Sequence, residues 1–278
     1  MSRNYYYLVA GLPELFMEQN KRPFDLAAFK AELREFLHPD DFSLVEVLFL
    51  PYDHLNLLSL LQKKNTPFHP LGKFSADELE EEIREPLAVP SYFKNFIERF
   101  REEADTPQDQ TWENQLTELY YDHASSCSNP FIRTWFGFEK NLRNILTAYT
   151  CRKFGMAADH ELVGQGEFVE SLKKSQARDF GLSGEVDFMD RLLSILDNPN
   201  LFEREKGLDL LRWNYLDELN TFHYFTIEVI LAYVIKLLII ERWLILDRST
   251  GEQLFRQFLE DLRSSYEFPT EYTTHERR

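Results

Sequence analysis

The chain is short of cysteine, glycine and proline. Its 2 cysteines, Cys127 and Cys151, have no metal-ligand spacing, and nothing in the sequence resembles a secretory signal peptide. We therefore expect both to be reduced cytosolic thiols. The 10 glycines and 12 prolines leave long segments of the 278 residues unbroken. Such segments favour helices over a β architecture with many turns.

The chain also lacks a basic surplus and a long hydrophobic run. Its formal net charge is −16 with the basic residues scattered, which excludes nucleic acid and anionic lipid as expected ligands. A basic protein partner and a solubilising role for the charge both stay open. The most apolar run, Val229 to Ile240, contains Lys236 and is shorter than the ~18 residues of a membrane span. We expect no direct membrane insertion.

Motifs for phosphate, dinucleotide or nucleophile chemistry are missing. Gly72-Lys73 is followed by Phe74, so no P-loop is present, and Gly164-Gln165-Gly166 lacks the third glycine of a dinucleotide fingerprint. Asp122, His123 and Ser125 are adjacent in sequence, but adjacency does not make a catalytic triad, and a loop is expected there. The sequence predicts no catalytic residue and no cofactor, and a protein that is not an enzyme.

The 7 histidines give no metal motif. None lies four residues from another, as a helical zinc pair would require. Glu218, His223 and Glu228 share a region predicted to be helical, but spacings of five turn them onto different faces. We expect no metal site, and His223 is interpreted as a capped or partly buried histidine.

What the chain does have is apolar and aromatic bulk. Hydrophobic residues make up 44% and aromatic residues 15%, with 24 phenylalanines, so the core should be aromatic. Ser75 followed by Glu78 is a capping box, and Gly155 is placed to end a helix. For residues 5–10 a strand and a helix both remain open. Periodicity and breakers predict helices over residues 24–37, 42–62 with a break at Pro51, 77–85, 91–103, 112–121, 131–154 and 203–266, the last including an amphipathic face at Leu254, Phe255, Phe258, Leu259 and Leu262.

One helical pattern occurs twice. Asn56 to Leu61 and Asn141 to Leu146 share N-L-x-x-(L/I)-L, and a third apolar stretch, Phe225 to Leu246, contains Glu241-Arg242-Trp243. Repetition is typical of arrays of similar units. The amides of Asn56 and Asn141 are interpreted as bonding the backbone of a neighbouring helix, with a ligand contact as the alternative.

These residues resemble a known family. Phe225-Thr226-Ile227-Glu228 followed by Tyr233 resembles the C-terminal helix of the C subunit of V-type and A-type ATPases, also called the d subunit. Asp53 with Asn56-Leu57 is similar to that family's D-x-x-N-L helices. Gly251 and Leu262-Arg263 resemble its glycine-bearing link and helix ending. Leu237 to Ile240 and Trp243 depart from it, where the family has a Lys-Glu-x-Glu run and an asparagine. The chain thus resembles a divergent branch, like bacterial proteins encoded beside V-type ATPase subunits.

The resemblance implies an all-α protein of about three related helical bundles forming a wedge or funnel. It would be a single C-subunit-like domain over residues 1–278, with sub-bundles at about 1–104, 105–198 and 199–278. The implied function is a non-catalytic structural subunit that couples the membrane rotor ring to the central stalk of a V-type ATPase in rotary ion transport. Alternatives are an assembly or regulatory factor of that ATPase, and a helical enzyme with an unrecognised site.

The resemblance also implies partners and positions. The partners would be rotor-ring and central-stalk subunits, and the protein would be cytoplasmic, peripheral to the membrane through the complex. Asn56, Asn141, Glu228 and Tyr233 form the structural signature. The candidate partner-binding residues flank the matched helices, and for each one singly a solvated or salt-bridged role is the alternative: Arg143, Arg152, Lys153, Arg242 and Arg248.

Overall fold

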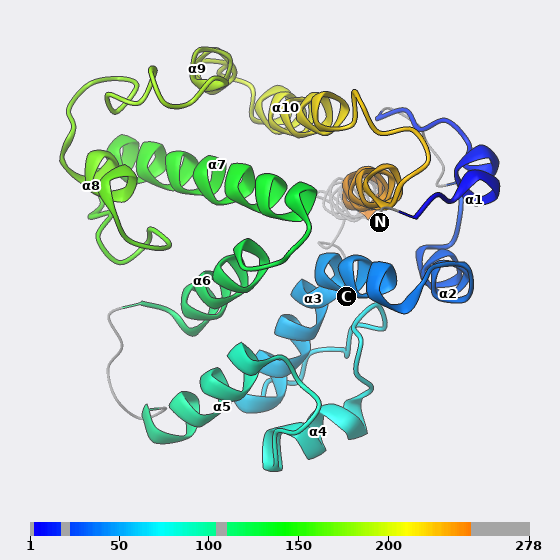
Figure 1. Ribbon diagram of the computed structural model, residues 1–278. Coiled ribbons are helices and arrows are strands. Elements are labelled where there is room, and N and C mark those ends of the chain that lie inside the picture. Colours follow the sequence, from blue (N-terminus) through cyan, green and yellow to red (C-terminus); the bar gives the residue numbers. More distant parts are fainter. Residues whose placement is uncertain (1–2, 18–22, 104–109, 246–278) are drawn as a thin grey trace, which may run out of the picture. The chain divides into compact units, whose positions relative to one another are not determined.

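The protein is all-α, as predicted. The computed structural model describes residues 3–17, 23–103 and 110–245, and within these ranges it contains helices and loops without a β-strand. The chain forms two compact units, one of residues 1–12 with 24–235 and one of residues 13–23 with 236–278. Helices run in the order α1 Tyr6–Gly11, α2 Leu26–Phe36, α3 Pro39–Leu61, α4 Ala76–Arg84, α5 Ser91–Glu103, α6 Trp112–Ser125, α7 Pro130–Phe154, α8 Glu167–Lys174, α9 Met189–Leu196 and α10 Leu201–Leu219, followed by a helix over residues 227–245 (Figure 1).

Two questions left by the sequence are answered at the N-terminal half of the chain. Residues 5–10 belong to a helix, because α1 begins at Tyr6. The predicted break at Pro51 is wrong, since α3 runs through it without interruption. A proline inside a helix removes one N–H and leaves the carbonyl four residues earlier without its usual donor. That carbonyl belongs to Val47, and it accepts a hydrogen bond from the Tyr120 hydroxyl at 2.9 Å instead.

The predicted helix ends are largely confirmed because their signals are local. Ser75 and Glu78 make both halves of the capping box that starts α4. Gly155 ends α7 with a φ of 66°, a left-handed conformation that glycine adopts without a steric penalty. The expected loop at Asp122 and His123 is wrong: both residues lie inside α6, which extends to Ser125.

The first unit packs its helices in a chain of neighbours. The long helix α3 contacts α2, α4 and α6, and α6 lies beside α7, which in turn contacts α8 (Figure 1). The core is aromatic as predicted, and among its largest fully buried side chains are Phe49, Phe93, Phe96 and Phe180. Close-packed aromatic cores have low compressibility.

α3 is long and apolar enough to span a membrane by length and composition, and half of its most apolar window is buried inside the protein. Its buried face also carries Asp53, His54 and Asn56. A core helix passes the same test of length and composition as a membrane span, so this finding is weak evidence for insertion.

The second unit is described over residues 13–17, 23 and 236–245. Residues 236–245 continue the helix that begins at residue 227, and Leu237, Ile239 and Ile240 are buried. The predicted amphipathic helix around Leu254 to Leu262 and the matched link at Gly251 lie outside the described residues.

Candidate functional site

The long helices α3 and α7 begin in the same way. His38 precedes Pro39 at the start of α3, and Asn129 precedes Pro130 at the start of α7. Proline suits the first helical position because its missing N–H would have no partner there and its φ is already helical. The side chain before each proline caps the helix: His38 Nδ1 accepts from the Asp40 N–H at 3.3 Å, and Asn129 Oδ1 accepts from the Ile132 N–H at 3.1 Å.

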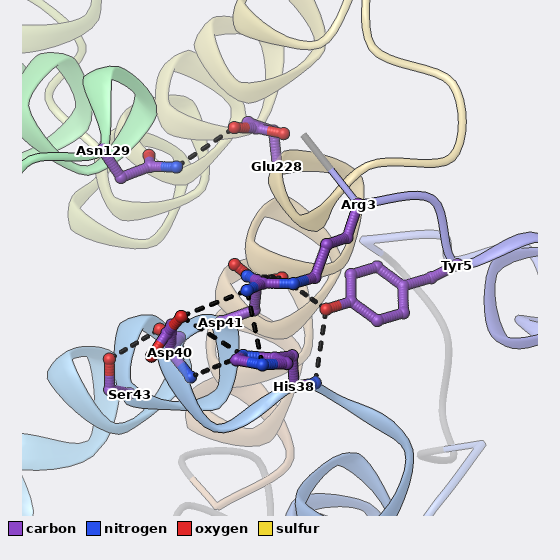
Figure 2. Close-up of polar contacts among 8 residues, drawn as sticks. All are labelled: Arg3, Tyr5, His38, Asp40, Asp41, Ser43, Asn129 and Glu228. Atoms are coloured by element: carbon purple, nitrogen blue, oxygen red, sulfur yellow. Dashed lines mark hydrogen bonds and ion pairs between the residues drawn. The ribbon is translucent and has the colours of Figure 1, made fainter. Parts of the chain in front are cut away.

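Asn129 also joins α7 to the helix over residues 227–245, which contains the third apolar stretch of the sequence and is called the third long helix below. Its Nδ2 donates to Glu228 Oε1 at 3.1 Å, while its Oδ1 caps α7 (Figure 2). Glu228 Oε2 lies 3.8 Å from His223 Nδ1. The expectation that the spacing of five separates His223 from Glu228 is therefore wrong, because residues 220–226 leave the helix and return His223 to the carboxylate.

The chain's first residues close on the start of α3. The Arg3 guanidinium lies 3.2 Å from Asp40 Oδ2 and 3.4 Å from Asp41 Oδ2 (Figure 2). The Tyr5 hydroxyl donates to the Asp41 carboxylate and accepts from the His38 N–H at 3.3 Å. Burial, with the bond to Asp41, raises the pKa of Tyr5 to about 12. The Tyr5 N–H donates to the Phe225 carbonyl at 2.6 Å, so one residue touches both α3 and the segment before the third long helix.

This junction is an assembly of hydrogen bonds and ion pairs between the protein's own groups. Asp40 is 73% exposed and Arg3 41%, so that ion pair is solvent-screened and contributes little to stability. Over the residues that the structure describes, no group of three or more His, Cys, Asp and Glu is placed to hold a metal ion. The contacts at this junction connect the first residues of the chain to α3 and to Phe225, and α7 to Glu228.

The signature asparagine Asn56 clamps a loop. Its Nδ2 donates to the His69 carbonyl at 3.0 Å, and its Oδ1 accepts the His69 N–H at 2.7 Å. The prediction that the amide bonds backbone is right for Asn56, but the partner is in the loop after α3 rather than in a neighbouring helix. Both polar backbone groups of one residue are thereby satisfied by one side chain.

In the second long helix the same clamp is made by Asn144, which corrects the assignment to Asn141. Asn144 Nδ2 donates to the Val163 carbonyl at 2.8 Å, and Asn144 Oδ1 accepts the Val163 N–H at 2.9 Å. Asn144 is buried, whereas Asn141 is half-buried. Aligning Asn56 with Asn141 therefore shifts the second copy of the pattern by three residues, nearly one helical turn, from the residue that makes the same hydrogen bonds. The signal that could have found it is the N-x-x-N spacing of Asn141 and Asn144, which parallels Asp53 and Asn56.

Asp53 also binds the backbone of the loop between α3 and α4. Its carboxylate accepts the Lys73 N–H at 2.8 and 2.9 Å and the Phe74 N–H at 3.2 Å. Gly72 has to be a glycine here, because a Cβ at this position would lie 2.5 Å from Asp53 Oδ1. Burial raises the pKa of Asp53 against these hydrogen bonds and the neighbouring Lys30. Lys30 itself donates to the Leu71 carbonyl at 2.8 Å.

Aligning Asn56 with Asn144 places Pro51 opposite Glu139, and both positions link a long helix to a helix further along the chain. Pro51 frees the Val47 carbonyl for Tyr120 of α6. Glu139 Oε1 accepts from Arg212 Nε of α10 at 2.8 Å. Arg212 also lies 3.1 Å from Asp209. Burial alone would lower the pKa of Arg212, but the two carboxylates outweigh it and raise that pKa.

Two of the candidate partner-binding residues, Arg143 and Arg152, are hydrogen-bonded within the protein. Arg143 donates to Asn114 Oδ1 at 2.7 Å, and Arg152 donates to the Ala177 and Ser175 carbonyls and lies 3.9 Å from the Phe180 ring centroid. Lys153 and Arg242 are exposed, and Arg242 lies 5.8 Å from the Trp243 ring. Arg248 lies outside the described residues.

Tyr233, the remaining signature residue, packs edge-on against Phe29 of α2 with ring centroids 5.8 Å apart. Burial raises its pKa to about 12. Glu228 and Tyr233 thus place residues 227–235, the part of this helix that belongs to the first unit, against the start of α7 and against α2. Sequence reasoning missed Arg3, Asn129 and Tyr120, because each acts through a residue distant in the sequence.

A family model with the description "Protein of unknown function (DUF2764)" matches residues 1–265. No curated protein and no solved structure matches the chain.

Proposed function

We propose a non-catalytic coupling role for this chain, which belongs to the DUF2764 family. In this proposal the protein is a structural subunit between the membrane rotor ring and the central stalk of a V-type ATPase. Its arrangement would be that of the V-type ATPase C subunit, about three related bundles forming a wedge or funnel. It would be cytoplasmic and held at the membrane by the complex.

The observation that carries the proposal is the repeated loop clamp. Asn56 and Asn144 each fix the backbone of a following loop with a pair of hydrogen bonds, on two long helices that begin with a cap and a proline. A part that transmits torque has to hold its segments rigidly. Buried amide clamps and an aromatic core supply rigidity without any chemistry.

The contacts of the signature residues are a further support for the same role. Glu228 and Tyr233 both make contacts between helices, to Asn129 and to Phe29. Asp53 with Asn56-Leu57 keeps the D-x-x-N-L pattern, while the second copy reads N-x-x-N-I, with Asn141 in the place of the aspartate and Ile145 in the place of the leucine. A residue set that holds helix to helix is what a mechanical part needs.

A second candidate is an assembly or regulatory factor of the same ATPase. The observation that favours it is a group of exposed aromatic side chains, including Tyr7 and Phe222, each 85% exposed. A permanent component of a complex covers its apolar contacts there, while a transient factor exposes them when free.

The test is purification of the tagged protein from its native membranes, with quantification of co-purified subunits after detergent extraction. Stoichiometric recovery of rotor-ring and central-stalk subunits is expected. Recovery of soluble subunits in small amounts would favour the assembly factor, and recovery of no ATPase subunit would overturn both and reopen the search for an enzyme. Lys153→Glu with Arg242→Glu tests the exposed partner-binding candidates, with Lys94→Glu on α5 and Arg191→Glu on α9, two other exposed residues, as the charge-matched control.

A further inference from the structure

Exposed aromatic side chains gather where α1 meets the end of α2 and the segment before the third long helix. The Tyr6 and Phe225 rings lie 4.7 Å apart, and the Tyr7 and Phe36 rings lie 6.3 Å apart. We call Tyr6, Tyr7, Phe36 and Phe225 the aromatic patch. Their exposed fractions are Tyr7 85%, Tyr6 59%, Phe36 50% and Phe225 38%. Phe222 and Tyr224 precede Phe225 in the same loop and are 85% and 69% exposed.

The aromatic patch rests on a fixed backbone. Leu8 is buried and anchors α1, and the Tyr5 N–H donates to the Phe225 carbonyl at 2.6 Å. The Tyr5 hydroxyl is held by Asp41 and His38. The rings are therefore presented to solvent from a scaffold that is already ordered. Large aromatic side chains held in this way contribute more than most residues to binding and lose little entropy when a partner covers them.

The charges beside the aromatic patch are mostly negative. Arg3 is paired with Asp40 and Asp41, so it adds no free positive charge. The last turns of α2 carry the exposed Glu32, Arg34 and Glu35, and α10, which precedes the loop that contains Phe225, ends with the exposed Glu218, three acids and one base in all. A second copy of a chain with a net charge of −16 would be repelled, as would an anionic membrane.

We propose that the aromatic patch docks an amphipathic helix of a partner protein, with an apolar face flanked by lysine and arginine. The apolar face covers the rings, and the basic flanks meet the acids at the ends of α2 and α10. This proposal does not depend on the role in a V-type ATPase, because it rests on exposure and charge alone.

The test uses the full-length protein and two synthetic fluorescent helical peptides of about 18 residues, a length at which helices form in water. Both have the same leucine face, and one carries lysine and the other glutamate on the remaining positions. Fluorescence anisotropy measures binding. The lysine peptide is expected to bind, and Tyr7→Ser with Phe36→Ser, which removes two rings that lie side by side, is expected to weaken binding about tenfold or more. The matched control is Phe154→Ser with Phe202→Ser, which removes exposed aromatics elsewhere and is expected to change binding by less than about twofold.

Several results would overturn the proposal. Equal binding of the lysine peptide to wild type and the patch variant would mean attraction by charge alone. Equal binding of both peptides, or of neither, would remove the role of the acids or the site itself. A dimer in sedimentation that the patch variant abolishes would make a second copy the occupant, and flotation with phosphatidylcholine vesicles would make it a membrane. Binding that appears only with Phe255→Ser and Phe258→Ser would assign the patch to the chain's own C-terminal residues.

Discussion

The first and second long helices hold their following loops with the same device in different surroundings. Asn56 clamps His69, which is half-exposed, while Asn144 clamps Val163, which is fully buried. The identical pairs of hydrogen bonds show that the loop position is what the repeat preserves. The difference in burial means that the second clamp has no water to replace it.

The positions around the clamp differ in chemistry. In the first helix His54 is buried and lies 2.7 Å from the Tyr92 hydroxyl, and the equivalent position in the second helix is Leu142, also fully buried. Pro51 of the first helix is replaced by Glu139 in the second. A repeated fold therefore tolerates a polar or an apolar interior at matched positions, provided that each polar group finds a partner.

The largest expected effect is on the two contacts that join α3 to α6 and α7 to α10. Glu139→Leu leaves Arg212, whose side chain is 19% exposed, with Asp209 as its remaining carboxylate and should cost about 3 kcal/mol in the free energy of unfolding, measured by urea denaturation. Tyr120→Phe leaves the Val47 carbonyl without its donor and should cost about 1–3 kcal/mol.

The variant Pro51→Ala separates the contribution of the hydrogen bond between Tyr120 and the Val47 carbonyl from that of side-chain packing around Tyr120. Alanine restores an N–H that can donate to Val47 within the helix, so Tyr120→Phe should cost less in that background. An equal cost of Tyr120→Phe with proline or alanine at position 51 would contradict the explanation of how α3 accommodates its proline.

The next prediction compares the free energy of unfolding lost when each clamp is removed. Asn144→Leu unpairs the buried N–H and carbonyl of Val163 and should cost about 2–4 kcal/mol by urea denaturation. Asn56→Leu should cost about 1–2 kcal/mol, because water can reach the half-exposed His69. Asn141→Leu is the control for the register of the repeat, and a cost equal to that of Asn144→Leu would contradict the alignment.

A further effect, absent at neutral pH, is a difference in acid stability. Burial lowers the pKa of His54 from 6.5 to about 3, so the unfolded chain binds this proton and the folded chain does not across that window. This stability is complete above pH 6.5 and is lost as the pH falls toward 3, by about 2–3 kcal/mol at pH 4.5.

His54→Leu with Tyr92→Phe makes the first helix resemble the second and avoids an unpaired hydroxyl. The double variant should lose this acid sensitivity in thermal unfolding between pH 7 and pH 4.5. His160→Leu, at an exposed histidine, should keep it. An unchanged pH dependence in the double variant would place the acid sensitivity elsewhere.

Local signals predicted most of the helices. The capping box at Ser75, the stop at Gly155 and the start at Ser91 were readable because each involves residues within one turn of one another. The break at Pro51 was wrong because its compensation comes from Tyr120, 69 residues further on in the printed sequence. A separation of 99 residues hid the contact of Asn129 with Glu228.

The candidate site was predicted in kind but not in register. An asparagine bonded to backbone was expected, and Asn56 confirms it, yet the second copy is Asn144 and the partners are loops. A three-residue shift keeps a helical pattern nearly in phase, so periodicity cannot choose between Asn141 and Asn144. The sub-bundle boundaries and the partner roles of Lys153, Arg242 and Arg248 stay predictions.

The sequence by itself determined that the chain is helical, where most helices begin and end, and that its core is aromatic, because propensity, capping and hydrophobic period act over a few residues. Only the tertiary structure decided which polar side chains meet, such as Tyr5 with Asp41 and Arg212 with Glu139. It also decided which aromatic rings remain uncovered. Those outcomes depend on where distant segments pack, and no local pattern records the position of a partner that lies far along the chain.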